Sequence, residues 1–252
     1  VPRVIQPRSP RYNVELGRYL RHIEHKLYES IDHLWGSRTI MKGMSVEQMG
    51  QTICSKWNTI RHPVAIGFDA SRFDQHVSVG ALRYEHSIYK ALYHYDAELV
   101  QLLEWQVHNK GTGYASDGYF NYTVDGKRMS GDMNTSLGNC LLSCLIMKDF
   151  VDKYGIKAEL INNGDDNVLI CSEDDEDVVK EHLYNHWLEY GFEMVCEPTV
   201  RVLEQVEFCQ MKPVYDGSAY IMVRNPLTTM SKDAYSITPF NNIKVARKWI
   251  HA

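Results

Sequence analysis

The sequence predicts an α+β fold in which an antiparallel sheet carries acidic residues and helices cover its back. Residues 160–170 run from apolar to polar and back to apolar, with Asn-Asn-Gly-Asp-Asp in the middle. The flanks are short and the central residues tolerate the positive φ angles of a tight turn, so a β-hairpin is favoured over a helix. Residues 64–68 form another short apolar strand, which ends at Asp69. Helices near 78–95, 137–150 and 175–190 are expected to back this sheet.

The first sixty residues are predicted to be an arm followed by two helices. Prolines punctuate residues 1–12, which also carry several arginines, so this segment is expected to be extended. A helix is expected from Asn13 to Gly36, because apolar residues recur there in steps of three and four. Ser45 and Gln48 have the spacing of a capping box and predict the start of a second helix.

The segment between the two acidic strands combines helices, a hairpin and a polar loop. Beyond the helix at 78–95, a second helix is expected at about 97–107. The glycines near residues 111–118 indicate a loop, and residues 119–129 resemble a hairpin that turns at Asp125 and Gly126. A polar loop with glycine hinges then leads into the apolar helix at 137–150.

After the acidic hairpin, the helix at 175–190 is expected to lead into strands at 192–196, 206–211 and 219–223. A weakly helical segment at 243–250 closes the chain. No internal repeat or linker is visible, so any subdomains are interleaved.

Length and composition narrow the class of protein. The 252 residues can form one sizeable domain, or one domain with parts of two others. The net charge of −5 weakly disfavours nucleic-acid binding, yet arginines crowd the first segment of the chain.

The cysteines include no C-x-x-C pair and are interpreted as free thiols of a reducing compartment. No apolar run approaches the roughly 20 residues needed to cross a bilayer. Because the chain begins with Val1 and not with methionine, we interpret it as a piece of a longer protein.

Three or four carboxylates are expected to converge near the ends of the predicted strands, from the set Asp69, Asp74, Asp165 and Asp166. The competing interpretation is a solvated turn, but the apolar flanks indicate a buried support. Two unit charges about 4 Å apart repel by roughly 4 kcal/mol at an effective dielectric of 20, so a divalent cation would balance the cluster. Oxygen ligands select Mg²⁺ or Mn²⁺ over zinc. Two such ions would support an in-line displacement at phosphorus.

The loop at 130–139 offers hydrogen-bonding groups beside flexible glycines. Gly131 and Gly138 allow a close backbone approach, while Ser130, Thr135 and Asn139 recur at four- and five-residue spacing and could recognise a sugar hydroxyl. A capped helix start is the alternative interpretation, because it needs only one of these residues.

Together these segments resemble motifs A, B and C of viral RNA-dependent RNA polymerases, in the same order. The matching residues are Asp69-x4-Asp74, Ser130-Gly131-x3-Thr135-x3-Asn139 and Gly164-Asp165-Asp166. The amino-acid sequences of residues 3–8 and 69–78 are most similar to those of the polymerases of tombusvirus-like plant positive-strand RNA viruses (Tombusviridae). The resemblance covers nearly the whole chain.

The resemblance implies a polymerase palm with part of the fingers and the start of the thumb. By this likeness residues 1–60 are a fingers portion with a basic arm similar to motif F, and residues 61–213 are the palm. A fingers segment is inserted at about 96–129, and residues 214–252 form the palm–thumb junction. More fingers would precede this region and a thumb would follow it, so activity of the isolated piece is doubtful.

The resemblance also implies roles for individual residues. Asp69 and Asp165 would be the principal ligands of two Mg²⁺ (or Mn²⁺) ions, with Asp166 as a supporting catalytic carboxylate. The nucleotide would be bound by residues of motifs A, B and F, namely Asp74, Ser130, Gly131, Thr135, Asn139, Arg3 and Arg8. Among these, Asp74 and Asn139 would recognise the 2′-hydroxyl, and the arginines would hold the triphosphate. Ordinary surface arginines are the alternative for the arm.

Two further motifs follow from the same likeness. Residues 207–212 resemble motif E, which holds the primer end, and the helix at 175–190 would belong to motif D. Motif D often supplies a lysine as general acid, but Lys180, Arg201 and Lys212 all remain open for that role.

The expected activity is RNA-templated RNA synthesis from ribonucleoside triphosphates, replicating the genome of a positive-strand RNA virus. The expected partners are an RNA template, the nascent strand, and viral and host replication proteins. Replication complexes on membranes in the host cytoplasm would be the location, reached through parts outside this piece. Whether initiation needs a primer stays open.

Two other functions compete with this one. A reverse transcriptase would carry a bulky side chain at Asp74 and usually an aromatic residue at Asn163. A non-enzymatic RNA-binding or assembly module could keep the fold, but an unused carboxylate cluster costs stability.

Overall fold

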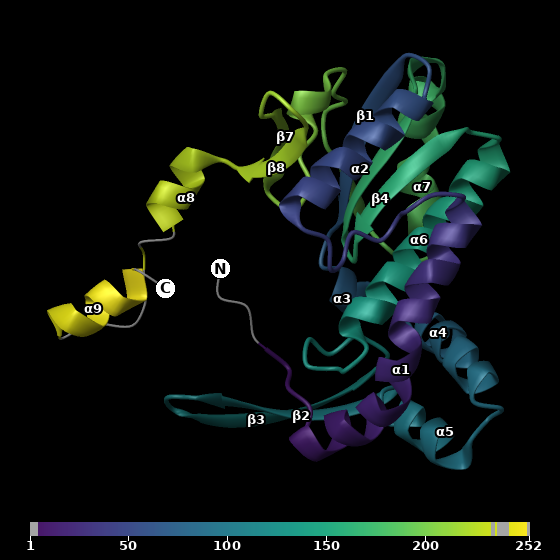
Figure 1. Cartoon of the computed structure of the whole chain (residues 1–252). Coiled ribbons are helices and arrows are strands. Elements are labelled where there is room, and N and C mark those ends of the chain that lie inside the picture. Colours follow the sequence, from purple (N-terminus) through teal and green to yellow (C-terminus); the bar gives the residue numbers. More distant parts are fainter. Residues whose placement is uncertain (1–4, 233–234, 236–241, 251–252) are drawn as a thin grey trace.

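The computed structural model describes residues 5–232, 235 and 242–250. Its centre is a four-stranded antiparallel sheet with the order β4–β5–β1–β6 (Figure 1). The strands are β1 (Pro63–Ala70), β4 (Ala158–Asn163), β5 (Asp166–Ser172) and β6 (Met194–Cys196). β4 and β5 form the predicted hairpin, and β1 pairs with β5 on one side and with β6 on the other. The predicted α+β class with an antiparallel sheet is confirmed.

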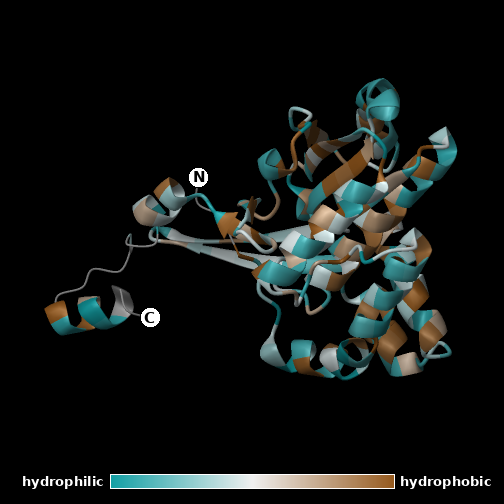
Figure 2. Cartoon of the chain, turned by 45° about the horizontal axis from the view of Figure 1, so that its top comes forward, coloured by the Kyte–Doolittle hydropathy of each residue, from teal (hydrophilic) through white to brown (hydrophobic). Residues whose placement is uncertain are grey.

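Both faces of β1, β4 and β5 are buried along most of their length, and alternate residues of each strand point to opposite sides of the sheet. Val64 and Leu169 belong to one hydrophobic core, whereas Ala65 and Val168 belong to the other. The strands therefore read as continuous apolar runs and not as an alternating pattern. Figure 2 shows hydrophobic residues along the sheet and on the helices that face it.

The larger core lies between the sheet and a layer of helices. This layer comprises α1 (Pro10–Trp35), α4 (Val79–Leu92), α5 (Ala97–Glu104), α6 (Thr135–Tyr154) and α7 (Glu176–Glu189). Trp187 of α7 is fully buried, and its ring packs edge-on against Phe68 of β1 with centroids 5.7 Å apart. The same indole meets Phe192 at 5.9 Å. This aromatic group joins α7 to the strand that delivers Asp69.

The smaller core covers the opposite face of the sheet. It is formed by α2 (Val46–Thr59) and the hairpin of β7 (Met211–Tyr215) and β8 (Tyr220–Arg224). The expected capping box of Ser45 and Gln48 starts α2. Gly50 of α2 lies so close to β8 that a Cβ there would stand 2.3 Å from the carbonyl oxygen of Tyr220. A glycine is therefore required where this helix crosses the hairpin.

The remaining elements are peripheral or short. The hairpin of β2 (His108–Ala115) and β3 (Gly118–Asp125) extends away from the body (Figure 1). The short helix α3 (Phe73–His76) follows β1, and the 3₁₀ turns η1 (Glu173–Asp175) and η2 (Leu203–Gln205) connect later elements. Helices α8 (Pro226–Lys232) and α9 (Ile243–Ile250) end the described chain.

The predicted position of the peripheral hairpin was wrong. It turns at Ser116 and Asp117, and the glycines that were expected to mark a loop lie in its strands. A Cβ at Gly111 would lie 2.2 Å from the ring of Tyr122, and a Cβ at Gly113 would collide with the ring of Phe120 in the same way. These glycines accommodate aromatic rings from the opposite strand, which a local turn pattern does not reveal.

Two other expectations were also wrong. The arm was expected to remain extended through residue 12, but α1 begins at Pro10, because proline is tolerated in the first helical turn and Ser9 caps the helix. A strand was expected at 206–211, but this segment forms a turn with positive φ angles at Cys209 and Gln210. The strand begins only at Met211. The other predicted helices were confirmed within a few residues, and all six cysteines are free.

The close approach of α2 and β8 generates a stability prediction. Gly50→Ala is expected to lower the free energy of unfolding by about 1–3 kcal/mol, because the new methyl group would collide with backbone. Gly17→Ala in α1 is the matched control, since its Cβ would stand 3.4 Å from the flexible side chain of Met133. The control should leave stability unchanged or raise it by up to about 1 kcal/mol. Urea unfolding measures both, and equal midpoints for the two variants would contradict the prediction.

Candidate active site

Three of the predicted acids meet at one end of the central sheet. In the antiparallel register of β1 and β5, Asp69 is directly opposite Asp166, and Asp165 precedes Asp166 in the tight turn from β4. Directly opposed Cβ atoms in such a pair lie about 4.5–5.5 Å apart. Gly164, at φ 90°, supplies the positive φ angle of the turn. The side chains of Asp69 and Asp165 are exposed.

A buried amide network supports this turn from below. Asn162, which is fully buried, accepts a hydrogen bond from the backbone N–H of Gly164 (3.1 Å) and donates one to its carbonyl oxygen (2.8 Å). The Asn162 amide also donates to Asn167 Oδ1 (2.6 Å), and Asn167 donates to the carbonyl oxygen of Asp165 (2.9 Å). Ser143 of α6 donates to the same Asn167 oxygen (2.9 Å). The predicted buried support is therefore confirmed, although sequence analysis did not identify these three side chains.

The two adjacent acids of the turn have different surroundings. Asp166 Oδ2 accepts a hydrogen bond from the backbone N–H of Cys209 (2.8 Å), in the strained turn before β7. Burial raises the pKa of the Asp166 carboxyl, and the Cys209 bond only partly opposes this effect. Asp165 stands at the exposed tip. Asp166 is therefore anchored to a neighbouring segment, while Asp165 is presented outward.

Asp74 and Asn139 form a hydrogen-bonded pair beside the acidic turn. Asn139 Nδ2 of α6 donates to Asp74 Oδ1 of α3 at 2.9 Å. Burial raises the pKa of Asp74, nearby Asn139 and Arg128 lower it, and the charge of Asp165 raises it further. Residues that are 65 positions apart in the sequence are thus joined next to the acids of the sheet. Arg128, which donates from Nε to Asn139 Oδ1 (3.1 Å), was not identified from the sequence.

Other residues of the 130–139 loop are used in local contacts. Thr135 Oγ1 donates to the carbonyl oxygens of Met129 (3.0 Å) and Asp132 (2.9 Å), which stabilises the start of α6. Ser130 Oγ accepts from the backbone N–H of Gln6 (2.9 Å), and Gly131 N–H donates to the Gln6 carbonyl (3.0 Å). The binding of nucleotide by Ser130, Gly131 and Thr135 stays a prediction.

The basic arm lies against this loop. Arg8 donates from Nε to Asp132 Oδ1 and from Nη2 to Asn109 Oδ1, both at 2.5 Å. A Cβ at Gly131 would lie 2.6 Å from Cα of Pro7, so the two backbones are in close contact. Arg3 lies outside the described residues, and the triphosphate role of both arginines stays a prediction.

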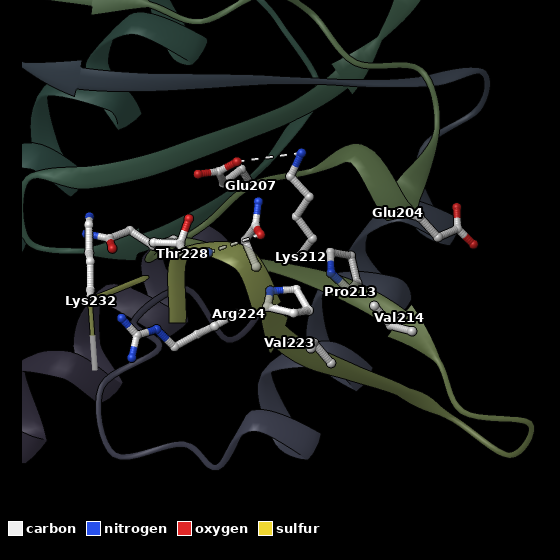
Figure 3. A pocket seen from close by; sticks show the side chains of 12 residues that line it. Glu204, Glu207, Lys212, Pro213, Val214, Val223, Arg224, Thr228 and Lys232 are labelled. Atoms are coloured by element: carbon white, nitrogen blue, oxygen red, sulfur yellow. Dashed lines mark hydrogen bonds and ion pairs between the residues drawn. The ribbon is translucent and has the colours of Figure 1, made fainter. Parts of the chain in front are cut away.

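The three possible general acids have different partners. Lys180 Nζ lies 2.5 Å from Glu176 Oε1, and Arg201 pairs with the other oxygen of the same carboxylate. Lys212 points to Glu207, with Nζ 3.6 Å from Oε2 (Figure 3). These two residues line an open cavity of about 740 Å³ between the β7–β8 hairpin and α8. None of these contacts assigns the proton-donating role.

Among the residues that the structure describes, no three His, Cys, Asp or Glu side chains are already arranged to hold a metal ion. The acids at the end of the sheet, Asp69, Asp165 and Asp166, are nonetheless chemically suited to one, because carboxylate oxygens are the ligands that hard divalent ions prefer. Within the described part of the chain, no helix combines the length and apolar character of a membrane span.

Comparisons with known proteins show the family to which the chain belongs. A family model described as viral RNA dependent RNA polymerase matches residues 1–252. The chain is 65% identical over 251 residues to the RNA-directed RNA polymerase of Panicum mosaic virus, covering 100% of this chain and 25% of that protein. It is 65% identical over 252 residues to the maize chlorotic mottle virus protein of the same name, covering 100% of this chain and 26% of that protein.

A more distant relative gives the same result. The RNA-directed RNA polymerase of tomato bushy stunt virus (strain Cherry) is 48% identical over 252 residues, which are 100% of this chain and 31% of that protein. The chain thus spans about a quarter to a third of the length of these relatives, and its resemblance to tombusvirus-like polymerases is confirmed. Because the family model matches from the first residue to the last, the chain belongs to the viral RNA-dependent RNA polymerase family.

Proposed function

We propose that this chain is the catalytic palm region, with parts of the fingers, of an enzyme that synthesises RNA on an RNA template. The observation that carries the proposal is the register that sets Asp69 opposite Asp166, with Asp165 beside them and the Asp74–Asn139 pair adjacent. Acids that would bind metal and a pair that would bind a sugar hydroxyl are the two recognition elements that ribonucleotide transfer needs. The names of the relatives support the same activity.

In the proposed reaction, the 3′-hydroxyl of the growing RNA attacks the α-phosphorus of a ribonucleoside triphosphate. A new phosphodiester bond forms, the bond to the β-phosphate oxygen breaks, and pyrophosphate leaves. Asp69 and Asp165 would hold two divalent ions, Mg²⁺ or Mn²⁺, and Asp166 would support them. When bound, such ions favour deprotonation of the attacking hydroxyl and stabilise charge on the leaving oxygen.

The chain itself contributes orientation and charge. The buried amides beneath the turn hold the backbone of Asp165 at the tip, so the backbone that carries its carboxylate does not have to be ordered when the substrate binds. The Cys209 N–H holds Asp166 and thereby links the turn to the segment that resembles motif E. Asp74 has a second carboxylate oxygen besides the one that accepts a hydrogen bond from Asn139. This second oxygen would accept a hydrogen bond from the 2′-hydroxyl of the ribose.

The layout and setting of the full protein belong to the same proposal. Residues 1–60 would be fingers, 61–213 the palm with an insertion at about 96–129, and 214–252 the junction with the thumb. RNA and ribonucleoside triphosphates would be the substrates, with viral and host replication proteins as partners. The enzyme would work in membrane-associated complexes in the host cytoplasm, attached through other parts of the protein.

The different surroundings of Asp165 and Asp166 generate a prediction about catalysis. In the full-length protein, Asp165→Asn should reduce RNA synthesis by at least about 10³-fold, because a metal ligand worth several kcal/mol is lost. Asp166→Asn should cost about 10–100-fold, as expected of a supporting group whose amide oxygen still accepts the Cys209 N–H. Incorporation of labelled ribonucleotide on an RNA template with Mg²⁺ measures both.

The matched control is Asp117→Asn, in the exposed turn of the β2–β3 hairpin, which should retain wild-type synthesis. Wild-type synthesis by Asp165→Asn would refute the metal assignment. A wild-type protein that binds RNA but synthesises none would favour the non-enzymatic RNA-binding module instead.

The Asp74–Asn139 pair generates a prediction about sugar selection. Asn139→Ala should lower the preference for ribonucleotides over deoxyribonucleotides by at least about tenfold, the size of one hydrogen bond to a charged group. The ratio of the two kcat/KM values for the same base measures it. Equal use of both sugars by the wild-type enzyme would remove Asp74 and Asn139 from the proposed role.

A further inference from the structure

A fully buried ion pair lies directly behind the Asp74–Asn139 pair. Glu85 of α4 and Arg128, which precedes the 130–139 loop, both have side chains with 0% exposure. Arg128 donates from Nη1 to Glu85 Oε1 (3.2 Å) and from Nη2 to Oε2, so both terminal nitrogens are bound. A buried carboxylate and guanidinium cost several kcal/mol each to remove from water unless every group is satisfied. In this pair, each of the three guanidinium nitrogens of Arg128 and both carboxylate oxygens of Glu85 have a hydrogen-bond partner.

Further hydrogen bonds complete the carboxylate. Glu85 Oε1 also accepts from the hydroxyl of Tyr89 (2.9 Å) and from Nδ2 of Asn134 (2.5 Å). Burial alone would raise the pKa of Glu85, yet it lies below its usual value because the charge of Arg128 stands against it. The pKa of Arg128 is raised, because the charge of Glu85 outweighs the effect of burial, which would lower it. Both groups therefore remain charged.

Gly138 makes room for the pair on α6. A Cβ at this position would lie 2.4 Å from Arg128 Nη2 and 2.5 Å from Glu85 Oε1. Any side chain would therefore displace the charged groups, one residue before Asn139. Gly138 thus lies within α6, inside the predicted helix at 137–150, and accommodates an ion pair.

The third guanidinium contact connects the ion pair to the proposed sugar site. Arg128 Nε donates to Asn139 Oδ1 at 3.1 Å, and a guanidinium has no acceptor. The Asn139 carbonyl must therefore face Arg128, so its amide nitrogen faces Asp74. The backbone N–H of Arg128 also donates to the carbonyl oxygen of Asp74 (2.8 Å). One residue thus orients both members of the pair.

We propose that Glu85 and Arg128 are positioning residues that set the discrimination between ribose and deoxyribose. Glu85 holds the guanidinium plane, Arg128 fixes the amide orientation of Asn139, and Asn139 holds the carboxylate of Asp74 toward the sugar. This inference rests on the proposed function, in which Asp74 and Asn139 recognise the 2′-hydroxyl. Neither Glu85 nor Arg128 contacts the substrate in this scheme.

Arg128→Lys and Glu85→Gln separate this role from simple packing. A lysine keeps the positive charge but lacks the planar fork that binds Glu85 and Asn139 together. Glutamine keeps the size of Glu85, but it would place an amide nitrogen, which is a donor, against the Arg128 guanidinium, which has no acceptor. Both variants should free the Asn139 amide to rotate, although Asp74 and Asn139 are not themselves substituted.

The test compares kcat/KM for a ribonucleotide and for the deoxyribonucleotide of the same base in the full-length polymerase. In both variants the ratio should fall about tenfold, through a loss with the ribonucleotide, while kcat/KM for the deoxyribonucleotide is kept. The ratio does not depend on the fraction of active enzyme, so partial unfolding cannot produce the change. Arg83→Lys and Glu181→Gln, at exposed helix positions, are the matched controls and should keep the wild-type ratio.

Asn139→Ala, measured alongside, separates failure of this inference from failure of the proposed function. If Asn139→Ala keeps the wild-type ratio, the sugar site itself is wrong. If Asn139→Ala lowers the ratio but Arg128→Lys and Glu85→Gln do not, the ion pair serves stability alone and the positioning role is overturned. It is likewise overturned if both pair variants fail to fold, as thermal unfolding would show, because the pair would then be a folding requirement.

Discussion

The antiparallel register of β1 and β5 is the constraint on which the rest of the structure depends. It sets Asp69 opposite Asp166, and a shift of one residue would send one of these side chains to the other face of the sheet. Both faces are packed, one under the α6 and α7 layer and the other under α2 and the β7–β8 hairpin. A shifted register would exchange the residues of the two cores and leave side chains of the wrong volume on both faces, so packing on both sides maintains the position of the acids.

Hydrogen bonds of buried polar side chains hold the groups around the acids in fixed positions. The amides of Asn162 and Asn167 satisfy the backbone of the acidic turn, and the Glu85–Arg128 pair satisfies Asn139 beside it. Each of these groups would be costly if left without a partner, which is why the side chains around the acids have little freedom to rearrange. An exposed acidic tip on a buried, fully bonded base is a suitable arrangement for reactions in which position matters more than covalent chemistry.

Segments far apart in the chain meet at this base. The arm at Gln6 and Arg8 lies on the 130–132 loop, and the turn at Cys209 binds Asp166. The site is thus shared among regions that the sequence assigns to different motifs. A change in one of them, such as the strained turn before β7, acts directly on a carboxylate of the sheet.

The sequence by itself determined the α+β class, the β4–β5 hairpin, most helices and the identity of the acids. These depend on local patterns: apolar periodicity, helix caps, and an Asn-Asn-Gly turn between short apolar runs. Only the tertiary structure decided the position of the β2–β3 turn, because glycines of one strand accommodate aromatic rings of the other. It alone revealed the partnership of Glu85 with Arg128, 43 positions away in the sequence. Nothing local marks such a pair, since its stability depends on burial from which water is excluded by distant segments.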